Sequence, residues 1–206
     1  MNKVITISRQ FGSGGREVGA KLAAKLQIPF YDKELIARAA KESGYAEAAF
    51  ENVEKKATNS LLYSIAMGMN AYGNQEIGYA QMSLDDQLYL IQASVIRQVA
   101  QEGPCVIVGR CADYVLRDFD NVVNIFISAG LEARKDRVIK LYQIKESKVD
   151  DELIKADKRR ANYYYYHANE KWGRTENYHL SLRSDYIGID NTVECILRYL
   201  EYAERG

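Results

Sequence analysis

The segment Gly12-Ser13-Gly14-Gly15-Arg16-Glu17 lies between a strand signal and a helix signal near the start of this chain of 206 residues. The β-branched run from Lys3 to Ser8 predicts a short strand before it. After it, Val18, Leu22 and Leu26 are spaced by four and predict one apolar face of a helix. A strand, a glycine loop and a helix in this order are the context in which backbone N–H groups and a helix N-terminus bind a phosphate.

The loop differs from the regular Walker A motif, which ends in Gly-Lys followed by Ser or Thr. Two registers are open: Gly15 replaces the lysine if Gly14 is the last motif glycine, and Arg16 replaces it if Gly15 is. In both registers Arg16 is the only cation of the loop placed to reach a phosphate, and Glu17 is the oxygen donor at the usual Mg²⁺ position. A glycine turn that only packs a helix on a strand is the alternative interpretation.

Composition describes an ordinary globular protein, with 47% hydrophobic and 27% charged residues. Lys plus Arg and Asp plus Glu number 28 each, and this balance argues against a nucleic-acid or membrane-surface partner. Cys105, Cys111 and Cys195 have no CxxC spacing, so neither a disulfide framework nor a zinc site is expected. Because no leader pattern and no run of roughly 18 apolar residues occurs, we expect a cytoplasmic protein.

Alternating strand and helix signals run along the rest of the chain and predict an α/β fold with a five-stranded parallel sheet flanked by helices. We expect a single domain over 1–206. Arg110 follows the most apolar strand, at the edge where open α/β sheets bind ligands. Further strands are predicted at 29–32, 105–109, 121–128 and 184–190, and helices at 33–41, 83–101, 131–145, 150–171 and 192–204, the last capped by Asn191.

Two segments are predicted to be helical projections from this fold. The segment 45–82 has no strand signal and several glycines, which fits either a mobile insertion or an ordinary helical hairpin. The segment 145–175 is strongly charged, and in Tyr163-Tyr164-Tyr165-Tyr166 some rings must pack while others are exposed, because four successive residues cover every face of a helix. The basic residues of 131–145, among them Arg134 and Arg137, are interpreted as a solvated face.

The chain resembles the cytidylate kinase-like family of nucleoside monophosphate kinases over nearly its whole length. The block Ile5 to Glu17 carries most of the resemblance, and Pro29-Phe30-Tyr31-Asp32 corresponds to the family's Tyr-Leu-Asp-Thr-Gly stretch. Val108-Gly109-Arg110 resembles the family's Gly-Arg-Asp step, and Asp157-Lys158-Arg159-Arg160 resembles its basic lid helix. Here Cys111 replaces the Asp of Gly-Arg-Asp.

This resemblance implies a P-loop kinase fold, with a substrate-binding insertion at 45–82 and a lid at 145–175. It implies ATP and Mg²⁺ as cofactors and CMP or dCMP as the acceptor, with Arg38 and Arg110 pointing into one cleft. The implied residues are Gly12, Ser13, Gly14, Gly15, Arg16 and Glu17 for ATP; Arg16, Arg159 and Arg160 for catalysis; Asp32, Arg38 and Arg110 for the acceptor; and Glu17 and Ser8 for the metal.

Three functions remain open at this point. The first is an ATP-dependent kinase of a small phosphorylated acceptor, cytidylate first, and the arginines listed above favour it. The second is a nucleotide-binding regulatory protein with little turnover, which the missing lysine favours. The third is an oligomeric interaction module that uses 45–82 and has no nucleotide affinity. A homo-oligomer is compatible with all three.

Overall fold

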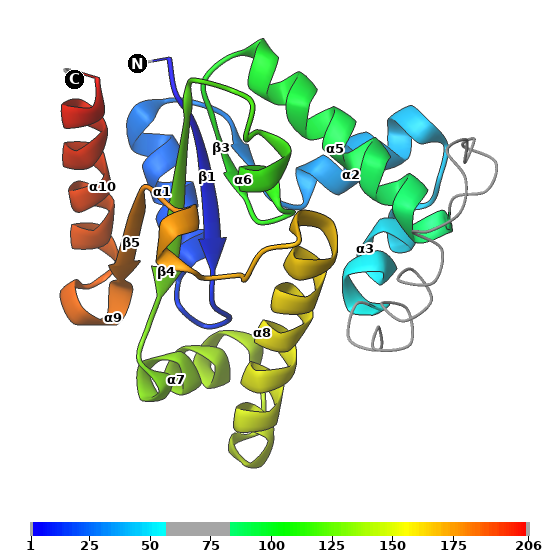
Figure 1. Ribbon diagram of the computed structural model, residues 1–206. Coiled ribbons are helices and arrows are strands. Elements are labelled where there is room, and N and C mark those ends of the chain that lie inside the picture. Colours follow the sequence, from blue (N-terminus) through cyan, green and yellow to red (C-terminus); the bar gives the residue numbers. More distant parts are fainter. Residues whose placement is uncertain (1, 57–82, 205–206) are drawn as a thin grey trace.

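The strand that precedes the glycine loop, β1 (Val4–Arg9), lies in the middle of a parallel sheet (Figure 1). The computed structural model describes residues 2–56 and 83–204. Within them the sheet has five strands in the order β2-β3-β1-β4-β5, and every neighbouring pair is parallel. The predicted five-stranded parallel sheet is therefore confirmed. The other strands are β2 (Phe30–Tyr31), β3 (Cys105–Val108), β4 (Val122–Ser128) and β5 (Leu180–Arg183).

Helices separate the strands along the chain, as a parallel sheet requires. The glycine loop leads directly into α1, and the Ser83 side chain caps α5 by accepting from the Asp86 N–H at 3.1 Å. The helices are α1 (Gly15–Leu26), α2 (Glu34–Ser43), α3 (Glu47–Lys56), α5 (Leu84–Glu102), α6 (Ala112–Val115), α7 (Leu131–Tyr142), α8 (Glu146–Ala168), α9 (Ser184–Ile187) and α10 (Ile189–Ala203), with a 3-10 turn, η3 (Thr175–Asn177).

Two hydrophobic cores cover the two faces of the sheet, because successive strand residues point to opposite sides. Ile5 and Ile7 face α1 and α10, in a core that includes Val18 and Val193. On the opposite face Ile107 packs in a core built with α2, α3, α5, α6 and α8. Helices on both faces fix β1 and β3 rigidly, and so they fix the loops that follow these two strands.

The predicted last strand at 184–190 is wrong. The strand is β5, directly before it, and Ser184 begins the short helix α9. Ser184 is buried, and its hydroxyl donates to the Ser13 carbonyl with the Ser128 carbonyl also in range, whereas Tyr186 is 84% exposed. The predicted cap is also wrong: Gly188 precedes α10 and Asn191 lies within it.

The two predicted projections are only partly described. Of 45–82, residues 47–56 form α3, and the segment 57–82 lies outside the described residues. Of 145–175, α8 supplies residues 146–168, in which Tyr163 and Tyr164 are buried and Tyr165 is exposed, as the packing argument predicts. The expected mobility of both segments stays a prediction.

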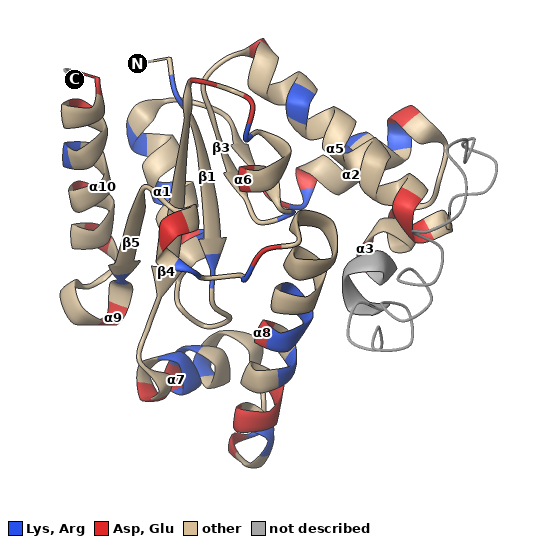
Figure 2. Cartoon of the chain, viewed as in Figure 1, with Lys and Arg blue, Asp and Glu red and all other residues tan. Residues whose placement is uncertain are grey.

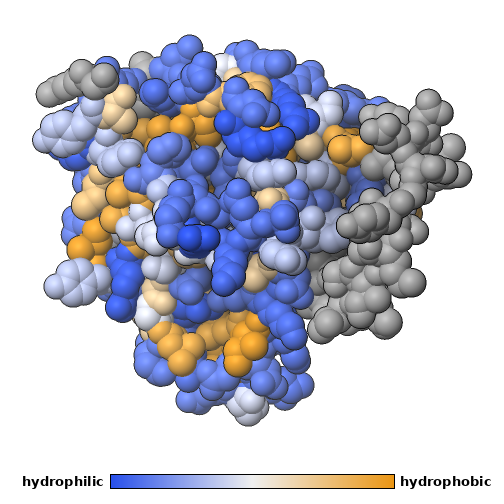
Figure 3. Space-filling model, in the orientation of Figure 1, coloured by the Kyte–Doolittle hydropathy of each residue, from blue (hydrophilic) through white to orange (hydrophobic). Residues whose placement is uncertain are grey.

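The outer surface is mostly hydrophilic on the face seen in Figure 3, with scattered hydrophobic patches. One patch lies over α7, where Leu131 and Leu141 are exposed. Cys105 is buried in β3. Within residues 2–56 and 83–204, no helix combines the length and the apolar character needed to cross a membrane. The cytoplasmic location and the single domain over 1–206 stay predictions.

Candidate active site

The glycine loop turns sharply at the carboxyl end of β1 and ends at the first residue of α1. Gly12 and Gly14 have φ angles of 79° and 77°, which an L side chain rarely adopts. A Cβ on Gly12 would lie 2.8 Å from the carbonyl oxygen of Arg134, so the approach of α7 also requires glycine there. The buried Ser13 hydroxyl accepts from the Gly15 N–H at 3.4 Å. The loop is therefore a fixed turn before a helix N-terminus, where an anion is favoured.

A cavity of about 380 Å³ lies over this loop; we call it the loop cavity. Basic side chains from four elements, β1, α1, α7 and α8, converge on it, and Figure 2 shows Lys and Arg residues along α7 and α8 next to the carboxyl ends of the strands. Such a lining suits a polyanionic ligand. The residues that line it are Arg9, Gln10, Phe11, Gly12, Gly14, Gly15, Arg16, Glu17, Ala20, Arg137, Leu141, Tyr142 and Arg160.

Arg16 and Asp32, predicted separately, lie together. Arg16 Nε donates to Asp32 Oδ2 at 2.5 Å, and the hydrogen bond and charge of Asp32 raise the pKa of Arg16 above its ordinary value. The Asp32 side chain is 8% exposed, but that of Arg16 is 60% exposed. Arg16 thus lies at the mouth of the loop cavity, with one guanidinium N–H directed to Asp32.

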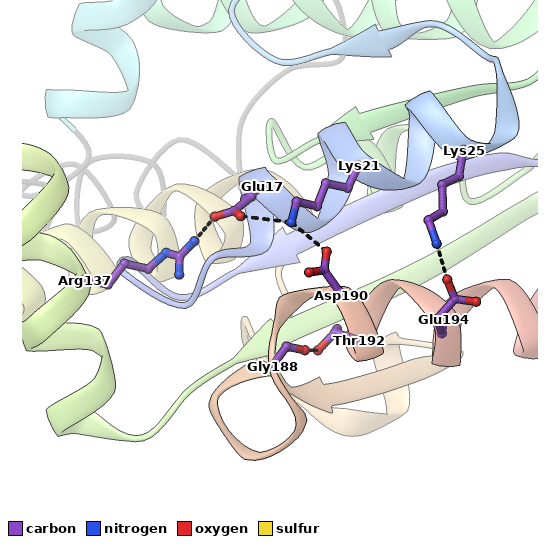
Figure 4. Close-up of polar contacts among 8 residues, drawn as sticks. All are labelled: Glu17, Lys21, Lys25, Arg137, Gly188, Asp190, Thr192 and Glu194. Carbon is purple, nitrogen blue, oxygen red and sulfur yellow. Dashed lines mark hydrogen bonds and ion pairs between the residues drawn. The ribbon is translucent and has the colours of Figure 1, made fainter.

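Glu17, the predicted metal ligand, lies between two cations (Figure 4). Its carboxylate pairs with Arg137 of α7 and lies 3.5 Å from Lys21, which in turn contacts Asp190 of α10 at 2.6 Å. The interpretation of Arg137 as part of a solvated face is corrected here, because it lines the loop cavity. Among the described residues no group of three or more His, Cys, Asp or Glu could hold a metal ion.

Arg134 attaches the glycine loop to α7 and α8. Its Nε donates to the Phe11 carbonyl at 2.7 Å, and its Nη2 pairs with Asp157 of α8. Asp157 accepts from the Phe11 N–H at 2.7 Å. The solvated-face interpretation is wrong for Arg134 as well, since the residue is 8% exposed. Both backbone polar groups of Phe11 are therefore satisfied by one ion pair, with Arg134 buried and Asp157 partly buried, which we call the Phe11 clamp.

A second cavity, of about 350 Å³, adjoins the first, and we call it the lid cavity. Phe11 and Arg160 line both cavities. Arg160 donates to the Arg9 carbonyl at 3.3 Å, and its guanidinium lies 5.5 Å from the centre of the Phe11 ring, within cation–π range. The other lining residues are Lys33, Glu51, Arg110, Ile144, Glu152, Ala156 and Arg159.

Arg110 reaches the lid cavity from a turn with unusual backbone geometry. Gly109, Arg110 and Cys111 have φ angles of 78°, 62° and 52°, all in the left-handed region. For a non-glycine residue this costs on the order of 1 kcal/mol, and such strain tends to persist at ligand sites. Arg110 also lines a small cavity that contains Ser8, the other predicted metal ligand.

Arg38 is directed elsewhere. It donates to Glu42 at 2.9 Å and to Glu102 at 2.6 and 3.1 Å, and these carboxylates raise its pKa. It is not among the residues that line the loop cavity or the lid cavity. The structure thus does not bring Arg38 and Arg110 to one of these two cavities.

Two titratable side chains that sequence reasoning missed, Asp113 and His167, have strongly shifted pKa values. Among the described residues, Asp113 on α6 makes no hydrogen bond of normal geometry. Burial raises its pKa to about 6, although the nearby Tyr164 hydroxyl acts in the opposite direction. His167 stacks on Tyr89 with ring centres 3.6 Å apart, and burial lowers its pKa to about 4. An acid held towards its neutral form and a histidine held neutral make this region sensitive to pH.

Comparison with known proteins agrees with this architecture. The model of the cytidylate kinase-like family matches residues 4–186. The crystal structure of an uncharacterized protein from Eubacterium ventriosum is 26% identical, with a TM-score of 0.72 over 97% of this chain and 99% of that one. No match is found among curated proteins.

More distant solved structures share the fold alone. Shikimate kinase from Bacteroides thetaiotaomicron is 15% identical, with a TM-score of 0.54 over 98% of this chain and 99% of that one. Shikimate kinase from Acinetobacter baumannii, in complex with shikimate, is 14% identical, with a TM-score of 0.50 over 98% and 95%. These similarities identify the sheet, the glycine loop and α1 as parts of a P-loop kinase fold.

Proposed function

The chain belongs to the cytidylate kinase-like family, and on this premise we propose that it transfers a phosphoryl group from ATP to a nucleoside monophosphate, CMP or dCMP first. One observation carries the proposal. The loop cavity and the lid cavity meet at Phe11 and Arg160, so a donor in one cavity and an acceptor in the other would have their phosphates on either side of the same guanidinium. Phosphoryl transfer needs donor and acceptor next to each other and neutralisation of the transferring group, which the shared guanidinium would supply.

The donor would bind in the loop cavity. The N–H groups of Gly12 and Gly14 would hold its phosphates, and those of Ser13 and Gly15 would join them after exchanging their contacts with the Gln10 carbonyl and the Ser13 hydroxyl. Arg16 would approach the phosphates from the mouth of the cavity. Glu17 fits a role in holding Mg²⁺, because Mg²⁺ commonly binds one carboxylate together with phosphate oxygens and waters. To do so it would exchange its contact with Arg137. Ser8 stays a second candidate, in the small cavity beside Arg110. When bound, Mg²⁺ would neutralise charge on the phosphates.

The acceptor would bind in the lid cavity, where Arg110, Arg159 and Lys33 supply positive charge. Arg110 would hold the monophosphate, and Asp32, which lines neither of the two cavities, would act on the acceptor only through Arg16, with which it pairs. Arg38 would have to exchange Glu102 for the acceptor, so it would act only after a rearrangement.

Two arginines of α8 would complete the catalytic machinery. Arg160 would neutralise charge on the transferring group from the wall shared by both cavities, and Arg159 would do so from the acceptor side. With both cavities filled, α8 would cover the reacting groups and exclude the water that would otherwise hydrolyse ATP.

The test is an ADP-release assay with ATP, Mg²⁺ and a panel of CMP, dCMP, UMP, AMP, GMP and shikimate. We expect turnover with CMP or dCMP. Arg110→Ala should raise the acceptor KM at least about tenfold and leave the ATP KM within about twofold, because one charge-assisted contact contributes about 1.5–3 kcal/mol. Arg198→Ala is the matched control, since Arg198 makes an exposed pair with Glu201 on α10.

A nucleotide-binding regulator with little turnover is the second candidate. It is favoured by the pairing of Arg16 with Asp32 and of Glu17 with Arg137, which neutralises the expected catalytic cation and the expected metal ligand within the chain. ATP binding without turnover on any acceptor would support it. Turnover on another phosphorylated acceptor would keep the kinase but replace its substrate, and no nucleotide binding at all would favour the interaction module.

A further inference from the structure

Compared with the regular phosphate-binding motif, this chain has a glycine where the motif has its lysine and a cation where the motif has its first glycine. In G-x-x-x-x-G-K-[ST] the lysine follows the first glycine by six positions and begins the helix. In this chain α1 begins at Gly15, and Gly14 is the left-handed residue before it. Gly15 therefore occupies the position of the lysine. The position of the first glycine is then held by Arg9, the last residue of β1.

We propose that Arg9 supplies the phosphate-binding cation of this site, and that the exchange of glycine and cation between positions 9 and 15 is a compensated pair. The proposal rests on the proposed function in one respect: it takes the ligand of the loop cavity to be a nucleoside polyphosphate.

The space around Gly15 shows why the two changes belong together. A Cβ on Gly15 would lie 2.5 Å from the Cβ of Arg9 and 3.0 Å from its Cγ, with Ile127 Cβ at 3.2 Å on another side. The first of these atoms is fixed to the backbone and cannot rotate away. The stem of Arg9 thus fills the volume from which a lysine at position 15 would have to start. A cation fits at position 9 or at position 15, but not at both.

The neighbours of the Arg9 side chain show where its positively charged guanidinium lies. A Cβ on Gly109 would overlap Arg9 Nη1, so the guanidinium lies against the glycine of the Gly109-Arg110 turn. Arg9 lines both the loop cavity and the small cavity that also holds Arg110. Its carbonyl accepts from Arg160, which fixes its backbone beside the lid helix. The guanidinium is therefore held between the glycine loop and the proposed acceptor arginine.

Arg16, the other cation near the lysine position, is less suited to this role. Its Nε donates to Asp32, and the side chain is 60% exposed at the mouth of the cavity. A guanidinium at Arg9 has several N–H groups and can bind two phosphate oxygens at once, whereas lysine acts as a point charge. The two arginines can be separated by experiment, because they lie at opposite ends of the loop.

The experiment measures the affinity of the purified full chain for ADP and for adenosine by calorimetry. The variants are Arg9→Ala, Arg9→Lys, Arg16→Ala, Gly15→Lys and the double variant Arg9→Gly/Gly15→Lys. Lys25→Ala is the control, because Lys25 lies on the same helix and pairs with the exposed Glu194. Adenosine carries no phosphate, so the ratio of the two affinities reports the phosphate contact within each variant, even where folding is weakened.

We expect Arg9→Ala to lower ADP affinity at least tenfold and to leave adenosine affinity unchanged, with Arg9→Lys intermediate. Gly15→Lys alone should lose ADP binding, and the double variant should regain it to within about fivefold of the parent. Equal ADP affinity in Arg9→Ala and the parent would overturn the proposal, and so would a parent that binds no ADP. A parent that binds ADP through Arg9 but turns over no monophosphate would leave this proposal standing and remove the proposed function. Turnover that is unaffected in Arg9→Ala would remove the Arg9 proposal and leave the proposed function standing.

Discussion

Removal of Asp157 should be among the most destabilising single changes in the chain, because it breaks the Phe11 clamp from one side. Asp157→Ala leaves the Arg134 guanidinium, whose side chain is 9% exposed, without its carboxylate. It also removes the acceptor of the Phe11 N–H, which lies at 2.7 Å. Breaking a buried pair by deleting one partner costs about 3–5 kcal/mol, since the remaining charge stays buried.

The magnitude is tested by urea unfolding of a set of variants. We expect Asp157→Ala to lower the free energy of unfolding by about 3–5 kcal/mol. Asp157→Asn, which keeps an acceptor oxygen, should lower it by less. The double variant Arg134→Met/Asp157→Leu should be destabilised by less than the sum of its two single variants, because it leaves no unpaired Arg134 guanidinium, although Phe11 loses both of its backbone partners. Glu194→Ala is the control, since its exposed pair with Lys25 is worth less than about 1 kcal/mol.

Two results would refute this reasoning. The first is an Asp157→Ala variant within 1 kcal/mol of the parent, because this would mean that water or a neighbour satisfies Arg134. The second is a double variant as unstable as the sum of its two single variants, because residues that form one pair should be coupled.

Four further predictions follow from other parts of the fold. The pKa of His167 is lowered to about 4 from an ordinary 6.5, so the neutral side chain contributes about 3 kcal/mol to the free energy of unfolding above pH 6.5. This contribution should be lost as the pH falls from 6.5 to 4. Unfolding measured as a function of pH should show this loss in the parent and not in His167→Phe. The pKa of Asp113 is raised to about 6 from 3.8, so the free energy of unfolding should fall as the pH rises from 3.8 to 6, and the loss is complete above pH 6. Asp113→Asn, which carries no charge, should raise the free energy of unfolding at pH 7.5 by up to about 3 kcal/mol. Gly12→Ala should lower the melting temperature more than Gly44→Ala, because both have a positive φ but only a Cβ on Gly12 meets other atoms. Arg38→Ala should raise the acceptor KM more than the ATP KM, and equal effects on both would remove Arg38 from the acceptor site.

The central fold could be predicted because its signals are local. The β-branched and apolar runs of β1 and β3 are buried on both faces, and the glycines of the loop are required by the φ angles of Gly12 and Gly14. The edge strand could not be predicted in the same way. β5 has only four residues with alternating partial burial, which resembles a loop, and the apolar residues that follow it lie in helices. The burial of Ser184 depends on carbonyls of the distant Ser13 and Ser128.

The residue types of the candidate site could be predicted from the sequence, but the contacts that link them to distant parts of the chain could not. Arg16, Asp32, Arg110, Arg159 and Arg160 could be named from motifs, because strand ends and helix starts are visible in the sequence. The roles of Arg134 and Arg137 could not, since a charge run does not reveal which side chains point towards a loop far away in the chain. For Arg9 a signal was present: it stands six positions before the missing lysine, where the motif has glycine.

The fate of the ATP γ-phosphate tests the central claim most directly. The purified chain is incubated with Mg²⁺, CMP and ATP labelled on the γ-phosphate, and the products are separated. We predict that the label appears in CDP in a one-to-one ratio with the ADP formed, and that Arg160→Ala slows this transfer at least about 100-fold, as removal of a preorganised charge donor does. Label that appears only in inorganic phosphate, or that remains on ATP bound to the protein with every acceptor tried, would contradict the account.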